Sequence, residues 1–128
     1  MNVNVLAVIV AGLIHIVYGL VWYSNFLFGK AWTELTGQEM KPAPAWMAPT
    51  ALGHLAAAYV LAVIINLANA GTLAAGAGVG LMVALGFFVP IQLGELTWEK
   101  IPVKLFLIRC GFHLSAMALI GAILAVWR

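Results

Sequence analysis

The sequence predicts an all-α integral membrane protein whose four spans pack as a helical bundle. Of its 128 residues, 65% are hydrophobic and only 8% are charged. Four apolar stretches are each close to the ~20 residues that cross ~30 Å of hydrocarbon. They cover residues 3–22, 47–68, 71–93 and 105–127. These spans leave no room for a soluble domain, so we expect residues 1–128 to form a single four-span transmembrane domain.

The first span is followed by a segment with its own helical pattern. The span has no Lys or Arg before it and is longer than a signal-peptide core, so we expect it to be retained. Beyond it, apolar residues recur at helical spacing at Phe28, Ala31, Trp32 and Leu35, and Gly37 provides a stop. This pattern predicts a short amphipathic helix that lies in the membrane interface.

Prolines and short turns separate the remaining spans. Pro49 suits the first turn of the second span. The turn at 66–71 is so short that the second and third spans should form a tight antiparallel hairpin. Pro90 removes the hydrogen bond to Gly86, so we expect a kink in the third span. A charged loop at 94–104 is expected to lead into the fourth span.

The basic residues predict the orientation of the chain. An even number of spans places both termini on one side, where the only basic residue is Arg128. The loops on the opposite side carry Lys30, Lys41, Lys100 and Lys104. Because Lys and Arg accumulate in cytoplasmic loops, we expect these two loops to be cytoplasmic and both termini to lie outside.

Ionisable and amide side chains inside the bilayer form the candidate functional site. Counting ~1.5 Å per residue from the lysine-bearing loops places three histidines at about the same depth, roughly 8–14 Å. Groups of this kind are costly in hydrocarbon, so each one needs a physical reason to be there. The candidate polar layer consists of His15, His54, His113, Gln92, Glu95 and Arg109.

The histidine layer has three interpretations. In the first, each neutral imidazole donates an interhelical hydrogen bond and fastens the bundle. In the second, the histidines form a proton or ligand pathway with Glu95 and with Tyr18 or Tyr59. In the third, they bind a metal or clamp a haem, although no HxxxH or CxxC spacing supports this. We expect no cofactor and no metal. Arg109 should either reach the headgroups or pair with Glu95 or Glu99.

Small residues at helical spacing predict close contacts between helices. They occur as the pairs Gly53 and Ala57, Gly76 and Gly80, and Gly111 and Ser115. Small side chains let helix backbones approach each other in lipid. Four helices need fewer such positions for their mutual contacts, so we expect some to face another subunit or a second copy of the chain. On this basis Gly80→Leu should disrupt assembly.

Several motifs resemble those of a known family. The Trp-Tyr-Ser element at 22–24 and the segment 28–32 resemble the signature that follows the first span in a bacterial family of small four-span proteins. Segments 105–108 and 125–128, together with His113, are similar to the last span of that family. The family is catalogued as a domain of unknown function. The resemblance implies a four-span fold in the bacterial inner (cytoplasmic) membrane and brings no known activity.

Two classes of function are consistent with these observations. In the first, the protein is a non-enzymatic scaffold or accessory subunit that packs against itself or against a larger membrane complex. In the second, it is a small carrier or proton-coupled channel that uses the histidine layer at His15, His54 and His113. A haem- or metal-binding redox subunit is a third class. The net charge of +2 is too small to indicate nucleic acid. We therefore expect the bilayer and other membrane subunits as partners.

Overall fold

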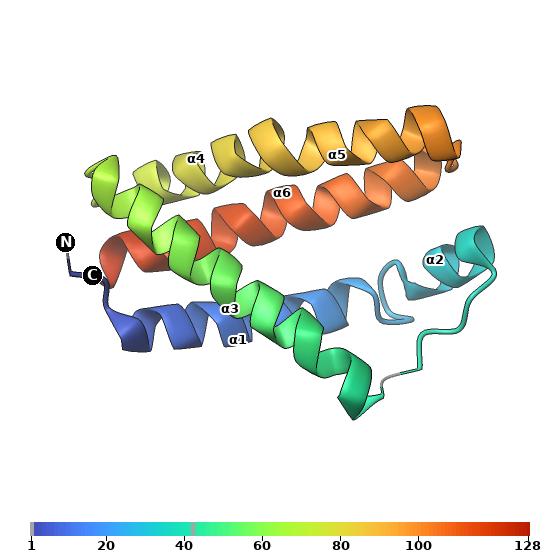
Figure 1. Ribbon diagram of the computed structural model, residues 1–128, viewed down its shortest axis with the longest axis horizontal. Helices are drawn as coiled ribbons and strands as arrows, with labels where there is room; N and C mark the ends of the chain where they lie inside the picture. Colours follow the sequence, from blue (N-terminus) through green and yellow to red (C-terminus); the bar gives the residue numbers. More distant parts are fainter. Residues whose placement is uncertain (1, 42) are drawn as a thin grey trace.

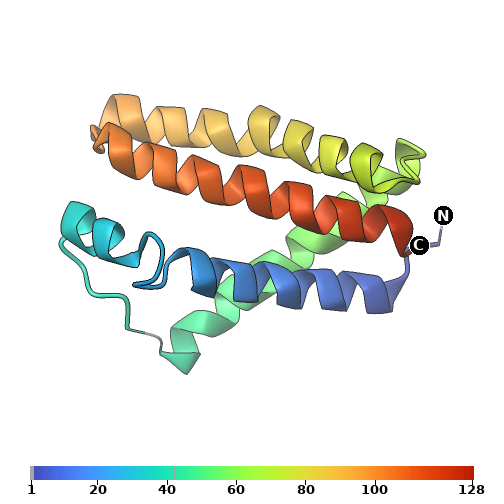
Figure 2. The same ribbon diagram turned by 180° about the vertical axis from the view of Figure 1, so that it is seen from behind.

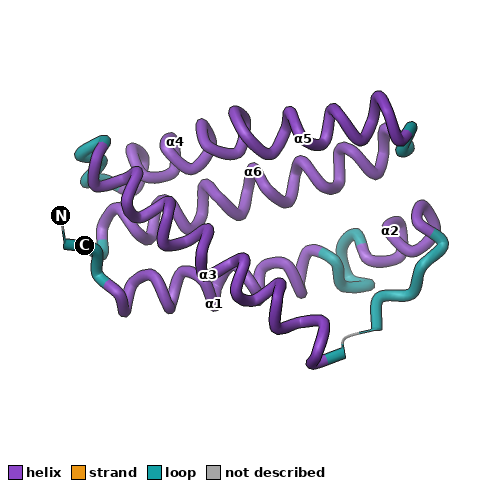
Figure 3. The backbone as a smooth tube through the Cα atoms, viewed as in Figure 1, coloured by secondary structure: helices purple, strands orange, loops and turns teal. Residues whose placement is uncertain are grey.

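The computed structural model describes residues 2–41 and 43–128 as an all-α bundle (Figures 1 and 3). In this part of the chain, four helical rods are long and apolar enough to cross a membrane. The predicted all-α membrane fold is therefore confirmed. The elements in order are α1 (Val5–Trp22), α2 (Gly29–Thr36), α3 (Pro44–Leu67), α4 (Leu73–Val83), η1 (Ala84–Phe88), α5 (Val89–Gly94), η2 (Glu95–Glu99) and α6 (Val103–Val126).

The helices divide the bundle into two ends. Both termini lie at one end and α2 lies at the other, and α3 crosses the remaining helices obliquely (Figures 1 and 2). Near the termini, the last turns of α3 lead into α4. At the α2 end, the first turns of α3 lie well away from α5 in both views. This divergence of α3 determines where the functional site forms.

Local signals explain the start of α1 and the turn into α2. The side-chain oxygen of Asn4 accepts a hydrogen bond of 3.1 Å from the Ala7 N–H, which caps α1. The turn into α2 requires Gly29, because a Cβ there would lie 2.7 Å from the carbonyl carbon of Ser24. Helix α2 ends at Gly37, whose φ of +68° is left-handed. The short helix predicted after the first span is thus confirmed.

The third helical rod, Leu73–Glu99, consists of α4, η1, α5 and η2 and is longer than the sequence predicted. We expected the span to end at residue 93 and a loop to cover 94–104, but η2 extends the helix to Glu99. The prediction was wrong because charged residues do not end a helix when no helix breaker is present. The chain turns at Lys100, which has a φ of +54°, and Pro102 then caps α6.

A π-helical segment precedes Pro90 in the third rod. The Val89 N–H bonds the carbonyl of Ala84, five residues earlier. Such π turns shift the hydrogen-bond register and accommodate residues that cannot donate to the regular ladder. The irregularity expected at Pro90 therefore takes the form of the η1 segment, and the rod continues through it as a helix.

Glycines determine the closest contacts between helices. A Cβ on Gly76 would overlap the carbonyl oxygen of Gly121, and a Cβ on Gly80 would overlap that of Met117. Both glycines therefore belong to the α4–α6 contact within the chain. The expectation that Gly80→Leu acts on assembly is corrected, because its effect should fall on folding. At Gly53, in contrast, an added Cβ would meet no described atom within 4 Å.

The core lies in the half of the bundle near the termini. Its largest fully buried side chains are Leu61 and Ile65 of α3 and Met117 and Ile120 of α6. Further toward the α2 end, a Cβ on Gly12 of α1 would lie 3.3 Å from the Leu55 Cα of α3. The two helices thus cross at very close range, and α3 diverges beyond that crossing.

Candidate functional site: a polar cleft at the α2 end

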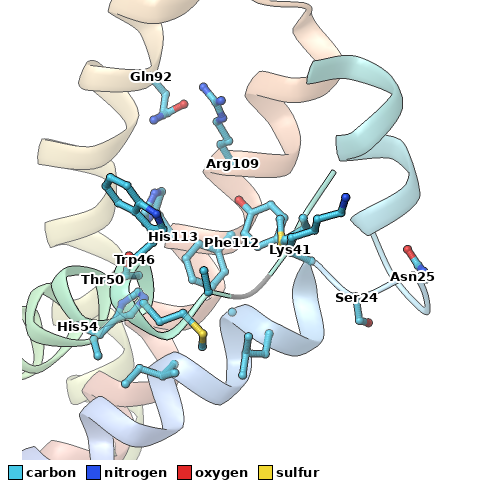
Figure 4. A pocket seen from close by; sticks show the side chains of 18 of the residues that line it. Ser24, Asn25, Lys41, Trp46, Thr50, His54, Gln92, Arg109, Phe112 and His113 are labelled. Atoms are coloured by element: carbon cyan, nitrogen blue, oxygen red, sulfur yellow. The ribbon is translucent and has the colours of Figure 1, made fainter. Parts of the chain in front are cut away.

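A cavity opens at the α2 end of the bundle, between the first turns of α3 and the other helices (Figure 4). Its volume is about 850 Å³, and its walls come from α1, α3, α5, η2 and α6 together with residues 23–25, 40, 41 and 43 of the connecting segments. Helix α3 packs against α1 and α6, but Pro44 and all residues of segment 45–50 are exposed. We call this cavity the cleft.

Apolar side chains line much of the cleft. Helix α1 contributes Ile16 and Leu20, and α3 contributes Trp46 and Met47. On the α6 side lies Phe112, which is only 5% exposed. The apolar lining means that a bound molecule would bury mostly hydrocarbon or ring surface there.

Polar groups from three rods converge on the same cleft. Thr50 and His54 come from α3, Gln92 comes from α5, and Arg109 and His113 come from α6 (Figure 4). The side chains of Thr50 and His54 lie one helical turn apart, as does Trp46 from Thr50, so one face of α3 turns toward the cleft. Five of the six members of the predicted polar layer line this cavity, since Glu95 also belongs to it.

The remaining member, His15, lies directly behind the cleft. It is 2% exposed, and its ring centroid is 4.0 Å from that of His54. The His113 ring stacks on Phe88 with a centroid distance of 4.5 Å. Phe112 lies between the histidines, at 5.7 Å from His15 and 5.1 Å from His113. The structure therefore gathers the three imidazoles around one phenyl ring.

The hydrogen bonding of the histidines differs from the simplest interpretation. Among the described residues, neither ring nitrogen of His15 has a hydrogen-bond partner, and both nitrogens are buried. The Nδ1 of His113 is also buried without a partner among those residues. The interpretation in which each histidine fastens two helices by a hydrogen bond is therefore wrong for His15. Buried polar atoms without partners usually mark a functional requirement.

An ion pair lies at the inner wall of the cleft. An Arg109 guanidinium nitrogen lies 2.5 Å from a Glu95 carboxylate oxygen, and both side chains are about a quarter exposed. Gln92 donates a hydrogen bond of 3.4 Å to the same carboxylate. Of the partners predicted for Arg109, the structure selects Glu95. The pair joins η2 to α6 and cancels the charge at this depth.

The contact between α1 and α6 is fastened by Tyr18 rather than by a histidine. The Tyr18 hydroxyl donates a hydrogen bond of 2.7 Å to the Ser115 hydroxyl. Ser115 in turn donates to the Gly111 carbonyl at 2.6 Å. Tyr59, the other tyrosine considered for a proton pathway, is 52% exposed. Gly111 and Ser115 were predicted to pack against another helix, and the structure shows that this helix is α1.

Sequence reasoning did not identify several residues of the cleft. Trp46 and Thr50 precede His54 by eight and four residues. This helical spacing could have indicated that all three side chains lie on the same face of α3. Phe112 is the direct neighbour of His113 in the sequence, which was the available signal for it, whereas nothing in the sequence brings Tyr23 to the histidines. Burial raises the pKa of the Tyr23 phenol above its ordinary value, and Arg109 opposes that shift. The phenol therefore remains a hydrogen-bond donor at neutral pH.

The geometry gives no support to a metal centre. Within residues 2–41 and 43–128, His, Cys, Asp and Glu side chains do not form any group of three or more that could hold a metal ion. The His113 ring instead stacks on Phe88, and the His15 and His54 rings lie close together but are tilted by 54°.

The fold and the cleft define a small multi-pass membrane protein with a ligand-sized cavity, lined by apolar and polar side chains, at one end. The sequence profile of a family described as a protein of unknown function, DUF1761, matches residues 6–125. The chain belongs to this family, which confirms the resemblance noted from its motifs. No curated protein and no solved structure is significantly similar to it.

Proposed function

We propose that the protein is a non-enzymatic membrane protein that binds a small ligand in the cleft and acts as a small carrier. The observation that carries this proposal is a cavity of about 850 Å³ with polar groups from three rods at its inner wall. Ligand sites in proteins have volumes of about 300–1,000 Å³ and combine apolar walls with a few converging polar groups. The cleft matches that description and favours the carrier hypothesis over the scaffold hypothesis.

The cleft is closed at the end that faces the termini. Toward the termini it meets the core, where Leu61, Ile65, Met117 and Ile120 are fully buried. A close-packed core of this kind does not pass water or solute. The arrangement therefore supports a site that is reached from one side in this conformation, as in a carrier, and argues against an open channel.

Accessibility labelling tests this proposal. In a Cys110→Ser background, we expect Thr50→Cys to react with a water-soluble maleimide, because Thr50 lines the cleft. Val60→Cys is the matched control on the same helix. Val60 is 53% exposed but lies beyond the cleft, facing acyl chains, and should not react.

The side of labelling tests the orientation as well. The predicted topology places the α2 end in the cytoplasm, so Thr50→Cys should react in inverted membrane vesicles and not in intact cells. Labelling in intact cells alone would reverse the orientation. If Thr50→Cys is as unreactive as Val60→Cys from both sides, the cleft is not open and the carrier proposal is wrong.

A scaffold role is the second candidate, and one observation favours it. Gly53, Gly78 and Gly86 are exposed, and a Cβ at any of them would meet no described atom within 4 Å. Exposed glycines on a membrane helix allow close approach of another helix. We expect Gly78→Leu to reduce the size of the assembly in lipid discs if the protein is a scaffold. An unchanged assembly size would contradict the scaffold role and leave the carrier as the only proposed function.

A further inference from the structure

The α3 side of the cleft is exposed on the outer surface of the bundle. Pro44 and all residues of segment 45–50 are exposed, and Trp46, which lines the cleft, is 81% exposed. Helix α3 is also one of the four helices that are long and apolar enough to cross a membrane. A molecule dissolved in the membrane could therefore reach the cleft past the first turns of α3.

The inner part of the cleft carries no net charge. The guanidinium of Arg109 is paired with Glu95 at 2.5 Å. Lys41, at the mouth, pairs with Glu39 at 2.7 Å in a fully hydrated position. Because this pair is already neutral, an ionic ligand would add an uncompensated charge next to the apolar walls of the cleft. An uncharged ligand avoids that cost and therefore fits best.

Flat rings from two helices line the cleft. Phe112 and His113 lie on the α6 wall, and Trp46 and His54 lie on the α3 wall (Figure 4). The His54 ring meets Phe112 edge to face, with an interplanar angle of 79°. Aromatic walls favour a planar guest, through offset or edge-to-face stacking. A neutral imidazole can also donate to a carbonyl and accept from a hydroxyl.

We propose that the cleft binds a membrane-dissolved molecule of the quinone class. Such a molecule has a planar, uncharged ring with carbonyl groups, or hydroxyl groups in its reduced form, and an apolar tail. The ring would lie between Trp46 and Phe112, and its oxygens would contact His54 and His113. The tail would leave past the exposed first turns of α3. This inference rests on the proposed function and specifies the ligand of the same site.

The test is direct binding of a decyl-substituted benzoquinone to the full-length protein in lipid discs, measured by equilibrium dialysis. We expect saturable binding at one site per chain. Trp46→Leu and His54→Leu should each weaken binding about tenfold, the loss expected for one stacking ring or one buried hydrogen bond. Trp98→Leu is the matched control, because Trp98 is 86% exposed at the same end of the bundle and does not line the cleft.

Competing amphiphiles separate the alternatives. Dodecanol, which has a hydroxyl and a chain but no ring, should not displace the quinone, and neither should phosphatidylglycerol, whose headgroup is anionic. Displacement by either lipid, or equal weakening by Trp46→Leu and Trp98→Leu, would overturn the quinone assignment. The proposed function fails separately, if Thr50→Cys proves unreactive from both sides of the membrane.

Discussion

Replacing Gly80 by leucine is expected to prevent the bundle from closing. A Cβ at Gly80 would overlap the backbone carbonyl of Met117, and backbone atoms of a packed helix cannot move aside as a side chain can. Ordinary overpacking costs about 1–3 kcal/mol. Because the obstacle here is backbone, we expect a loss of more than about 3 kcal/mol. Thermal unfolding in mild detergent, followed by far-ultraviolet circular dichroism, should show a much lower midpoint or no cooperative transition.

Gly78→Leu is the matched control for this prediction. It makes the same chemical change two residues earlier on α4, where an added Cβ would meet no described atom within 4 Å. Its unfolding midpoint should stay within a few degrees of that of the wild type. If both variants unfold alike, the α4–α6 contact does not depend on Gly80, and the packing described for this pair of helices is incorrect.

Loss of the Arg109 side chain should have the second largest effect. Arg109→Ala leaves the Glu95 carboxylate without its partner, next to apolar walls. Breaking a fully buried pair in this way costs about 3–5 kcal/mol, and breaking an exposed pair costs ~0–1 kcal/mol. Both side chains of this pair are about a quarter exposed. We therefore expect a loss of about 1–3 kcal/mol in the free energy of unfolding, measured by denaturant titration in detergent.

Two further variants isolate the contribution of the Arg109–Glu95 ion pair to stability. The double variant Glu95→Gln with Arg109→Gln removes both charges and should recover at least half of the loss, since neither partner is left as an unpaired ion. Lys41→Ala is the control for an exposed ion pair, as Lys41 and Glu39 are 82% and 71% exposed. It should change stability by less than ~0.5 kcal/mol. A loss for Lys41→Ala as large as that for Arg109→Ala would contradict this ranking.

The sequence was sufficient for the existence and approximate position of the four spans, because each signal is local. The prediction for Pro49 was wrong, since α3 begins at Pro44 and Pro49 lies inside the helix rather than in its first turn. Apolar runs of membrane length, the stop at Gly37 and the turn before α4 depend only on neighbouring residues. The common depth of the histidines follows from counting residues along each helix. The error at the end of the third rod is also local. Charged residues at Glu95 and Glu99 were taken as a loop, although the helix ends only at Lys100.

The sequence alone could not show which helix each small residue contacts. Gly76 and Gly80 have a spacing that fits contact with any other helix, in the same chain or in another. The structure assigns them to α6 because Gly121 on that helix allows the two backbones to meet. Gly53 has an equally suggestive spacing with Ala57, and yet a Cβ added there would meet no described atom within 4 Å. A spacing rule identifies the face of a helix but not what covers it.

By itself, the sequence determined that this is a four-span membrane protein, and it predicted a polar layer at one depth. Only the tertiary structure decided that the layer lines a cleft. The physical reason is the crossing of α1 and α3 at Gly12 and Leu55, beyond which α3 diverges and leaves His54 facing an open space. Helix depth is a property of each segment alone. A crossing angle depends on how two surfaces interdigitate, which no single segment encodes.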